Sequence, residues 1–386
     1  MLKNMREVVI AGVGLTRFNT YDGQKEDRPF LDYFDLGSEA ILKALTESEM
    51  DWKEIQAAFC GSVYCGTASG HQTIEKVGMT GIPIVNVENA CSSGSSAFRL
   101  AYQMVAAGIY DIVLAAGFEK MPQGFIKSTA WPEWQRRMGF NVQPASYAMG
   151  TVRYMEETGA TEEDFARVTV KNRKNGSLNP NARLQKEVTI EEVLASRIVA
   201  KPLRLLHACP LADGGTAVIL CGKNKLKTKK KMVTVAASVL TSQTYGHIYG
   251  GGSVKVKTPD TVSISADQAW EMSGYGPKDM DVVQAYDTMA PGELWDLEKL
   301  GFCSKGEAPR LLREGYFDLS GKLPVNTDGG LMSRGHPLGA TALAQIIEIY
   351  RQIRGEAGPR QVPNAKIGLA HSMGAGGNSA VTILKR

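Results

Sequence analysis

Cys91 stands where a nucleophile is expected, in the segment Val87-Glu-Asn-Ala-Cys91-Ser-Ser-Gly94-Ser-Ser. A β-branched run precedes it and a long amphipathic run follows it, which predicts a strand, a tight turn and a helix that begins near Ser92. The free N–H groups and the dipole at a helix N-terminus favour a thiolate, and the small residues after Cys91 let a substrate approach the sulfur. The alternative is a buried cysteine that packs behind the helix, the more common fate of a free cysteine.

His336 lies in a second glycine-rich turn, Gly335-His336-Pro337-Leu-Gly339, which leads into a predicted helix over 339–354. Pro337 suits a first helical turn, so the imidazole is presented at the helix start. An imidazole there can accept a thiol proton or donate to a carbonyl oxygen. The alternative is a histidine that only caps its helix.

The C-terminal segment contains two strand-like runs on either side of a glycine-rich turn, which predicts a hairpin. We expect the bend to expose His371 together with the backbone N–H groups of Met373 and Gly374. The glycines alone are equally explained by the chemistry of the turn.

These three segments together resemble the thiolase superfamily, over nearly the whole chain, and most closely its sterol-carrier-protein-type and archaeal branch. The supporting stretches begin at Arg6, Ile112, Lys201, Ala212 and Gly335. The resemblance implies that Cys91 is the acylated nucleophile and that His336 activates it and helps to bind the thioester oxygen. It places Met373 and Gly374 at the oxyanion, and His371 where many thiolases carry a second cysteine.

The chain departs from this branch at residues 282–289, where a His-Asp-Cys-Phe segment would supply an acid/base cysteine. Tyr286 and Asp287 stand there instead, and the expected second thiol is missing. We therefore expect His371 to transfer the proton at the substrate α-carbon, with Tyr286 and Asp287 as polar contacts in the pocket. The departure also suggests an altered, bulkier substrate.

The composition is that of a large enzyme, with 386 residues, 43% of them hydrophobic, and a net charge of +4. This charge is too small for a nucleic-acid-binding signature. No run approaches about 20 apolar residues and no leader opens the chain, which predicts a cytoplasmic protein without membrane contact. The cysteines lack metal-ligand spacing, so we expect reduced thiols and no metal site.

The pattern of strands and helices predicts an α/β protein built from two similar halves. Strands are expected over 7–13, 84–88, 112–117, 232–240, 281–286, 323–326 and 366–370, and helices over 36–48, 92–107, 263–274, 290–300 and 339–354. The resemblance implies a thiolase fold of five layers, α/β/α/β/α, with an inserted loop domain. The expected division is an N-terminal half over 1–120 and 207–230, the loop domain over 121–206, and a C-terminal half over 231–386.

The stretch over 121–206 is too long for a plain connection and is expected to fold as a subdomain. By resemblance it covers the active site and helps to bind CoA. Arg173 and Lys174 are candidates for contacts with CoA phosphates, although a solvated helix face explains them equally. Four apolar residues either line an acyl pocket or form the subdomain's own core: Trp131, Trp134, Met138 and Phe140.

The resemblance implies a thiolase that cleaves a 3-oxoacyl-CoA with CoA as substrate and no permanently bound cofactor. We expect a degradative role, in β-oxidation or aromatic degradation. The favoured example of a bulky substrate is 2-benzoylsuccinyl-CoA, whose thiolysis gives benzoyl-CoA and succinyl-CoA. The alternatives are an acetoacetyl-CoA thiolase and a partner-dependent retro-aldolase acting on a β-hydroxyacyl-CoA. A homodimer and a small zinc-ribbon/OB-fold partner subunit are also expected.

Overall fold

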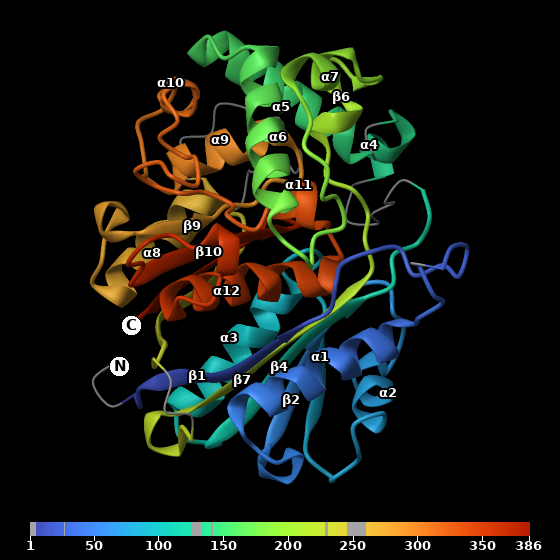
Figure 1. The fold of residues 1–386 in the computed structure, drawn as a ribbon, viewed down its shortest axis with the longest axis vertical. Coiled ribbons are helices and arrows are strands. Elements are labelled where there is room, and N and C mark those ends of the chain that lie inside the picture. The colour runs from blue at the N-terminus through green and yellow to red at the C-terminus, as the bar shows by residue number, and fades with distance from the viewer. Residues whose placement is uncertain (1–4, 27, 125–132, 140–141, 228–230, 245–259) are drawn as a thin grey trace.

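The computed structural model describes residues 5–386 except 27, 125–132, 140–141, 228–230 and 245–259. Nine described strands form one long sheet whose middle is a narrow junction between two halves (Figure 1). In spatial order the strands are β3 (Ile84–Val87), β2 (Ala57–Gly61), β4 (Ile112–Glu119), β7 (Gly214–Gly222), β1 (Val8–Leu15), β8 (Thr234–Thr241), β11 (Asn378–Lys385), β10 (Ile367–Gly374) and β9 (Val282–Gln284).

The two halves of the sheet repeat one topology. In the first half β2 is parallel to β3 and β4, and the antiparallel strands β7 and β1 follow. In the second half β9 is parallel to β10, and the antiparallel strands β11 and β8 follow. The strand expected over 323–326 is reduced to a parallel bridge between Val325 and Val283, in the place that β3 takes in the first half. The predicted duplication is therefore confirmed.

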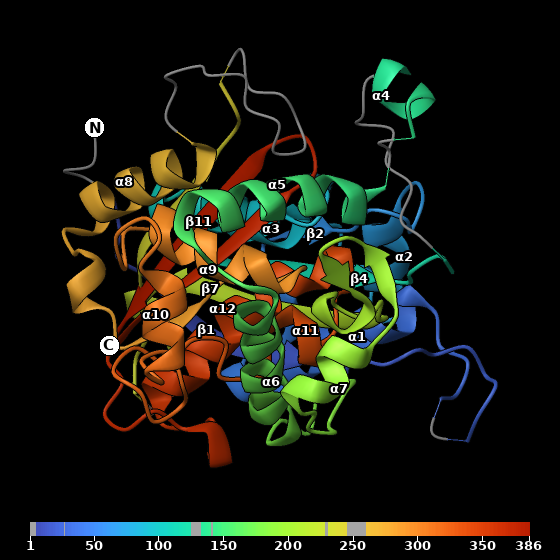
Figure 2. The same ribbon diagram turned by 90° about the horizontal axis from the view of Figure 1, so that it is seen from above.

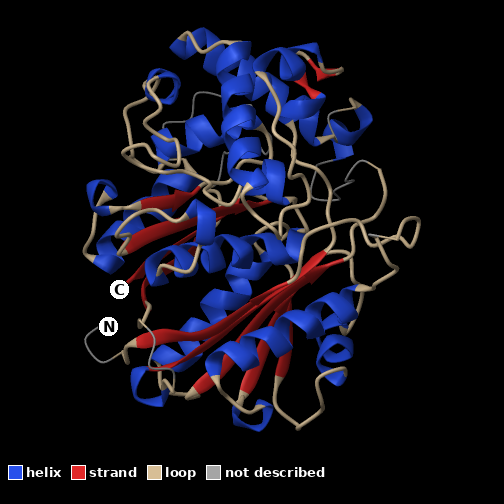
Figure 3. Ribbon diagram, viewed as in Figure 1, coloured by secondary structure: helices blue, strands red, loops and turns tan. Residues whose placement is uncertain are grey.

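Helices separate and cover the two halves, which produces five layers (Figure 3). α3 (Ser93–Ala106) and α12 (Leu338–Arg354) pack on each other between the halves of the sheet. α1 (Tyr33–Ser48) and α2 (Ser69–Glu75) lie outside the first half, and α8 (Thr261–Ser273) lies outside the second. The arrangement confirms the predicted α/β/α/β/α fold.

Glycines allow the two central helices to approach each other at their N-termini. A Cβ on Gly94 of α3 would lie 2.7 Å from the carbonyl oxygen of Gly339 in α12, and one on Gly117 of β4 would lie 2.3 Å from the same oxygen. A side chain at Gly94 would force the two helices apart, and one at Gly117 would push α12 away from β4. Because Cys91 and His336 precede these helices, the close packing brings the two turns that carry them to one region.

The described part of the segment over 121–206 lies above one end of the sheets in Figure 1 and faces the viewer in Figure 2. It contains α4 (Glu133–Arg137), α5 (Gln143–Thr158), α6 (Glu162–Ser177), α7 (Ile190–Ala195), β5 (Ile198–Ala200) and β6 (Leu203–Arg204). α6 packs against α9 (Ala290–Lys299), α10 (Ala308–Arg313) and α11 (Gly330–Arg334) of the second half. The domain division given above stays a prediction.

Two of the four apolar residues named for this segment are described by the structure, and both are exposed. Trp134 is 53% exposed and Met138 is 62% exposed, and Trp131 and Phe140 lie outside the described residues. For the two described side chains, neither a core nor a closed acyl pocket is observed. Every helix within the described ranges is too short or too polar to cross a lipid bilayer.

Candidate active site

The turn that carries Cys91 is tight and strained. Ala90 adopts a φ of 49°, a left-handed conformation that side chains disfavour. The N–H groups of Ser92 and Ser93 donate to the carbonyl oxygens of Asn89 and Ala90, which closes the turn directly before α3. Cys91 is 4% exposed at this point. The predicted strand, turn and helix are confirmed.

His336 is held as a neutral imidazole whose tautomer follows from its neighbours. Its Nδ1 lies 2.8 Å from the Oγ1 of Thr341, and this hydroxyl donates to the carbonyl oxygen of Pro337 at 2.8 Å. Because the Thr341 hydroxyl donates its proton to Pro337, it can only accept from His336. Nδ1 therefore carries the ring hydrogen, and Nε2 has a free lone pair. Burial, together with the positive charge of Arg334, lowers the pKa of His336 to about 3.

Tyr286 connects the turn of Cys91 with the turn of His336. Its hydroxyl lies 3.4 Å from Nε2 of His336, and the two rings meet edge to face at 5.8 Å. The same hydroxyl is hydrogen-bonded to the thiol of Cys91. Burial raises the pKa of Tyr286 well above its usual value, so the phenol keeps its proton. The structure thus brings Cys91, Tyr286 and His336 into one cluster, with the tyrosine in the middle.

The thiol of Cys91 is protonated at rest, contrary to the thiolate expected from the helix terminus. Burial raises its pKa to about 11, and the hydrogen bond from Tyr286 opposes this only in part. Burial outweighs the helix dipole because the sulfur is enclosed by apolar side chains, among them Leu331 and Leu338. The thiolate at pH 7 is roughly a hundredfold rarer than in an ordinary cysteine, so the site needs a base.

His371 does not reach this cluster, and its predicted role in proton transfer is corrected. The hairpin of β10 and β11 is present, but His371 lies within β10 and is fully buried, not exposed at the bend. Its Nε2 contacts the Oγ of Ser379 at 3.2 Å, and its Nδ1 lies 3.6 Å from Asp296 of α9. Burial lowers the pKa of His371 to about 3. Strand alternation decides this, because Ser372 is the residue whose side chain faces α3.

The bend of the same hairpin does reach the nucleophile turn. A Cβ on Gly374 would lie 2.3 Å from the carbonyl oxygen of Asn89, and Asn378 donates to the side chain of Asn89 at 3.1 Å. Met373 packs against the cluster that contains Cys91. The predicted place of Met373 and Gly374 beside the nucleophile is observed, and their role at an oxyanion stays a proposal.

Asp287 points away from the thiol and orients the start of α11. Its carboxylate accepts from the N–H groups of Leu331 at 2.8 Å and Met332 at 3.3 Å, and from Asn172 at 2.8 Å. Burial raises its pKa, and the nearby carboxylate of Glu293 adds to this. Asp287 is therefore a positioning residue rather than the pocket contact that was predicted.

The basic residues predicted to meet CoA lie in different surroundings. Arg173 is buried and donates from Nε to the carbonyl oxygen of Lys186 at 2.8 Å, so the structure turns it inward and contradicts a surface contact with phosphates. Lys174 is exposed on the last turn of α6, and its contact with CoA stays a prediction.

Two further residues at the site escaped the sequence reasoning. Glu119 ends β4 and accepts hydrogen bonds from the N–H groups of Val63, Tyr64 and Gly339, which ties α12 to the first half. Burial raises its pKa to about 7. A carboxylate at the end of an apolar strand was the signal available.

Cys209 is the second residue, and it packs in the cluster with Cys91. Its N–H donates to the carbonyl oxygen of Thr288, beside Asp287. A thiol is therefore present near the nucleophile, although burial raises its pKa far above the usual value. The sequence gives no signal for Cys209 at the site, because it is far from Cys91 along the chain and its sequence neighbours form no motif. Within the described residues, no group of three His, Cys, Asp or Glu side chains is arranged to hold a metal ion.

Comparison with known proteins identifies the family. Residues 8–224 match the family model "Thiolase, N-terminal domain", and residues 253–386 match "Thiolase C-terminal domain-like". The chain belongs to the thiolase family and is an acyltransferase enzyme.

Relatives of several kinds align with nearly the whole chain. It is 38% identical to the acetyl-CoA acetyltransferase of Methanothermobacter thermautotrophicus, over 99% of this chain and 100% of that one. It is also 38% identical to the benzoylsuccinyl-CoA thiolase subunit BbsB of Thauera aromatica, over 97% and 96%. Among solved structures, the Ltp2-ChsH2(DUF35) aldolase superposes with a TM-score of 0.87 at 25% identity, over 99% of this chain and 98% of that one.

Proposed function

We propose that this chain is a CoA-dependent thiolase that cleaves a 3-oxoacyl-CoA through an acyl-enzyme on Cys91. The observation that carries the proposal is the contact of the Tyr286 hydroxyl with both the Cys91 thiol and the Nε2 of His336. A hydroxyl has one proton to donate and lone pairs to accept, so it can pass the thiol proton to the imidazole. This relay supplies the base that the buried thiol needs.

In the first half-reaction the thiol proton of Cys91 moves to His336, and His336 later returns a proton to the product side. Cys91 gives its proton through Tyr286 to Nε2 of His336, and the thiolate attacks the β-carbonyl carbon. Backbone N–H groups of the turns at Cys91 and Gly374 are proposed to stabilise the oxyanion. When the Cα–Cβ bond breaks, the electron pair stays on the departing enolate. Tyr286 protonates its α-carbon and regains a proton from His336.

The second half-reaction restores the thiol. The thiol of free CoA attacks the acyl-enzyme carbonyl, the C–S bond to Cys91 breaks, and the proton of CoA returns through the same relay. The scheme assigns the acid/base step to Tyr286, which lies in the segment where the branch carries its acid/base cysteine, and the buried His371 takes no part.

The substrate is proposed to be bulky, with 2-benzoylsuccinyl-CoA as the favoured example and a degradative role. Support comes from the relative named for that thiolase, at 38% identity. The acetyl-CoA acetyltransferase relative has the same identity, so acetoacetyl-CoA is the competing substrate. An assay of both esters with CoA decides between them.

The assembly is proposed to be a homodimer with a small zinc-ribbon/OB-fold partner. The edge strand β3 supports the dimer, because no described strand pairs with its outer side and it is more exposed than the other strands of the sheet. The partner is supported by the solved aldolase, whose title names a second component, ChsH2(DUF35). The six free cysteines are consistent with a reducing, cytoplasmic compartment.

Retro-aldol cleavage is the second candidate, because the chain superposes well on a solved aldolase and lacks the acid/base cysteine that the branch carries in the segment around Tyr286. Such cleavage needs no thiol nucleophile. The test is Cys91→Ala, assayed with a 3-oxoacyl-CoA and with the matching β-hydroxyacyl-CoA. Thiolysis should disappear with Cys91, and trapping with radiolabelled acyl-CoA should label wild type alone. Persistent cleavage of the β-hydroxy ester by both proteins would establish the aldolase instead.

A further inference from the structure

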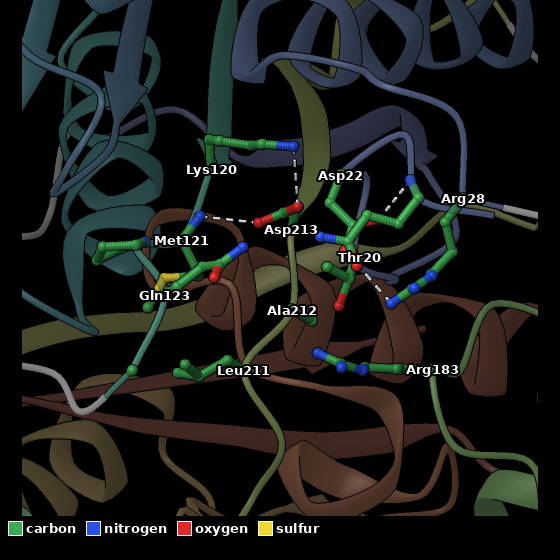
Figure 4. A pocket seen from close by; sticks show the side chains of 13 residues that line it. Thr20, Asp22, Arg28, Lys120, Met121, Gln123, Arg183, Leu211, Ala212 and Asp213 are labelled. Atoms are coloured by element: carbon green, nitrogen blue, oxygen red, sulfur yellow. Dashed lines mark hydrogen bonds and ion pairs between the residues drawn. The ribbon is translucent and has the colours of Figure 1, made fainter.

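A basic pocket opens beside the catalytic cluster, with a cavity volume of about 350 Å³ (Figure 4). This volume suits part of a small ligand. Its polar lining comes from three separate segments, around residues 20–28, 120–124 and 211–213, and from Arg183. The side chains of Arg28 and Arg183 reach into the same space from different segments.

The charges in the pocket leave one cation without a counter-ion among the described residues. Lys120 pairs with Asp213 at 3.2 Å, and Arg28 pairs with Asp22 at 3.4 Å. The guanidinium of Arg183 forms no hydrogen bond or ion pair with any described residue, although the charges of Asp213 and Asp22 act on it from further away. Its pKa is lowered, mainly by burial.

Arg28 also has unused donor capacity. Its Nε is buried and has no hydrogen-bond partner in the described part of the chain. A buried donor without a partner is costly, and a ligand oxygen would satisfy it. Two guanidinium groups around one cavity, with one net positive charge, match a carboxylate, which arginine binds with paired N–H groups.

The pocket lies within one side chain of the reacting groups. Met121 lines it and also packs against the cluster that contains Cys91. On the other side, the N–H of Arg183 donates to the carbonyl oxygen of Arg334, and a Cβ on Gly335, the residue before His336, would lie 3.5 Å from the Cβ of Arg183. The acyl group extends a few bonds from the attacked carbonyl, whereas the phosphates of CoA are separated from it by the pantetheine arm.

We propose that this pocket binds a carboxylate on the acyl part of the substrate, so that the enzyme prefers 3-oxoacyl-CoA esters with a second acid group. Arg183 is the main specificity residue and Arg28 assists it. The inference rests on the proposed thiolase function and narrows its substrate class to dicarboxylic acyl groups.

The test compares two esters of equal chain length, 3-oxoadipyl-CoA and 3-oxohexanoyl-CoA, which differ by a terminal carboxylate in place of a methyl group. Wild type should have the higher kcat/KM for 3-oxoadipyl-CoA. Arg183→Gln should lower that value roughly 10- to 100-fold, as expected for a lost hydrogen bond to a charged group, and change the value for 3-oxohexanoyl-CoA less than threefold. Arg28→Gln should act in the same direction, more weakly. Lys186→Gln, at a lysine whose side chain is 82% exposed, is the matched control and should change neither value.

Two results would overturn the proposal. Equal losses for both esters in Arg183→Gln would make the arginine a general structural residue. Weaker binding of free CoA by Arg183→Gln, measured by calorimetry, would assign the pocket to a CoA phosphate.

Failure of the thiolase function is a separate outcome. If neither ester is cleaved, calorimetry with Cys91→Ala still tests the pocket, because this variant binds the esters without reacting. Tighter binding of 3-oxoadipyl-CoA that is lost on adding Arg183→Gln supports the carboxylate site, and equal affinities for the two esters refute it.

Discussion

Tyr286→Phe removes one oxygen atom from the point where the two catalytic turns meet. The phenol hydroxyl is hydrogen-bonded to Cys91 and lies 3.4 Å from His336, and the phenyl ring keeps the packing of the cluster. Loss of a hydrogen bond to a charged group costs about 1.5–3 kcal/mol, which raises the pKa of Cys91 by a further ~1–2 units. The relay is lost at the same time, and general acid–base catalysis contributes about 10²–10⁴ to the rate.

Two measurements follow the loss. Iodoacetamide alkylation of the Cys91 peptide, quantified by mass spectrometry at pH 8, should slow roughly ten- to hundredfold. Turnover of a 3-oxoacyl-CoA should fall by about two to four orders of magnitude at unchanged circular dichroism. Tyr102→Phe, in the buried part of α3, is the matched control. If Tyr286→Phe alkylates and turns over like wild type, the hydroxyl is no relay and His336 must act on the thiol directly.

Three further predictions concern buried groups around the site. Because burial raises the pKa of Glu119 to about 7, its stabilising contribution is present below pH ~4.5 and is lost as the pH rises through 7. In urea unfolding, this group should make the free energy of unfolding about 2.5 kcal/mol lower at pH 8 than at pH 5, and Glu119→Gln should abolish that difference. The same pH dependence of the free energy of unfolding in wild type and in Glu119→Gln would contradict the prediction. His371→Ala should lower the free energy of unfolding by about 2–4 kcal/mol, because it leaves a cavity, and should change kcat less than threefold. A large drop in the kcat of the folded variant would show that His371 takes part in catalysis. Lys171 forms a buried ion pair with Glu293 at 2.9 Å, so Lys171→Met should cost about 3–5 kcal/mol in urea unfolding. Adding Glu293→Gln should recover part of that loss, and a purely additive double variant would refute the pairing.

The sequence predicted much of the fold because its elements have strong local signals. The helix expected over 92–107 is observed as Ser93–Ala106, and that expected over 339–354 as Leu338–Arg354. β7 was not predicted, although it lies inside the sheet between β4 and β1. Its run of glycine, alanine and aliphatic residues is buried throughout and shows no alternation, so periodicity gave no signal.

The candidate site was predicted in part. Cys91 and His336 were recognised because each stands in a glycine- or serine-rich turn before a helix, a pattern contained in a few adjacent residues. His371 was assigned a role because it falls where many thiolases carry a second cysteine and the expected thiol is missing, yet its side chain lies beside Asp296 of α9. Strand parity and the packing of neighbouring helices decide such a direction, and neither can be read from a single segment.

By itself, the sequence determined the two catalytic turns, the helices that follow them and the duplicated order of elements, because short-range sterics and hydrophobic pattern encode these features. The tertiary structure alone decided that Tyr286 lies between Cys91 and His336, that Cys209 shares their cluster, and that the thiol is protonated at rest. These properties depend on desolvation and on contacts between segments far apart in the chain, so they exist only once the two halves have packed together.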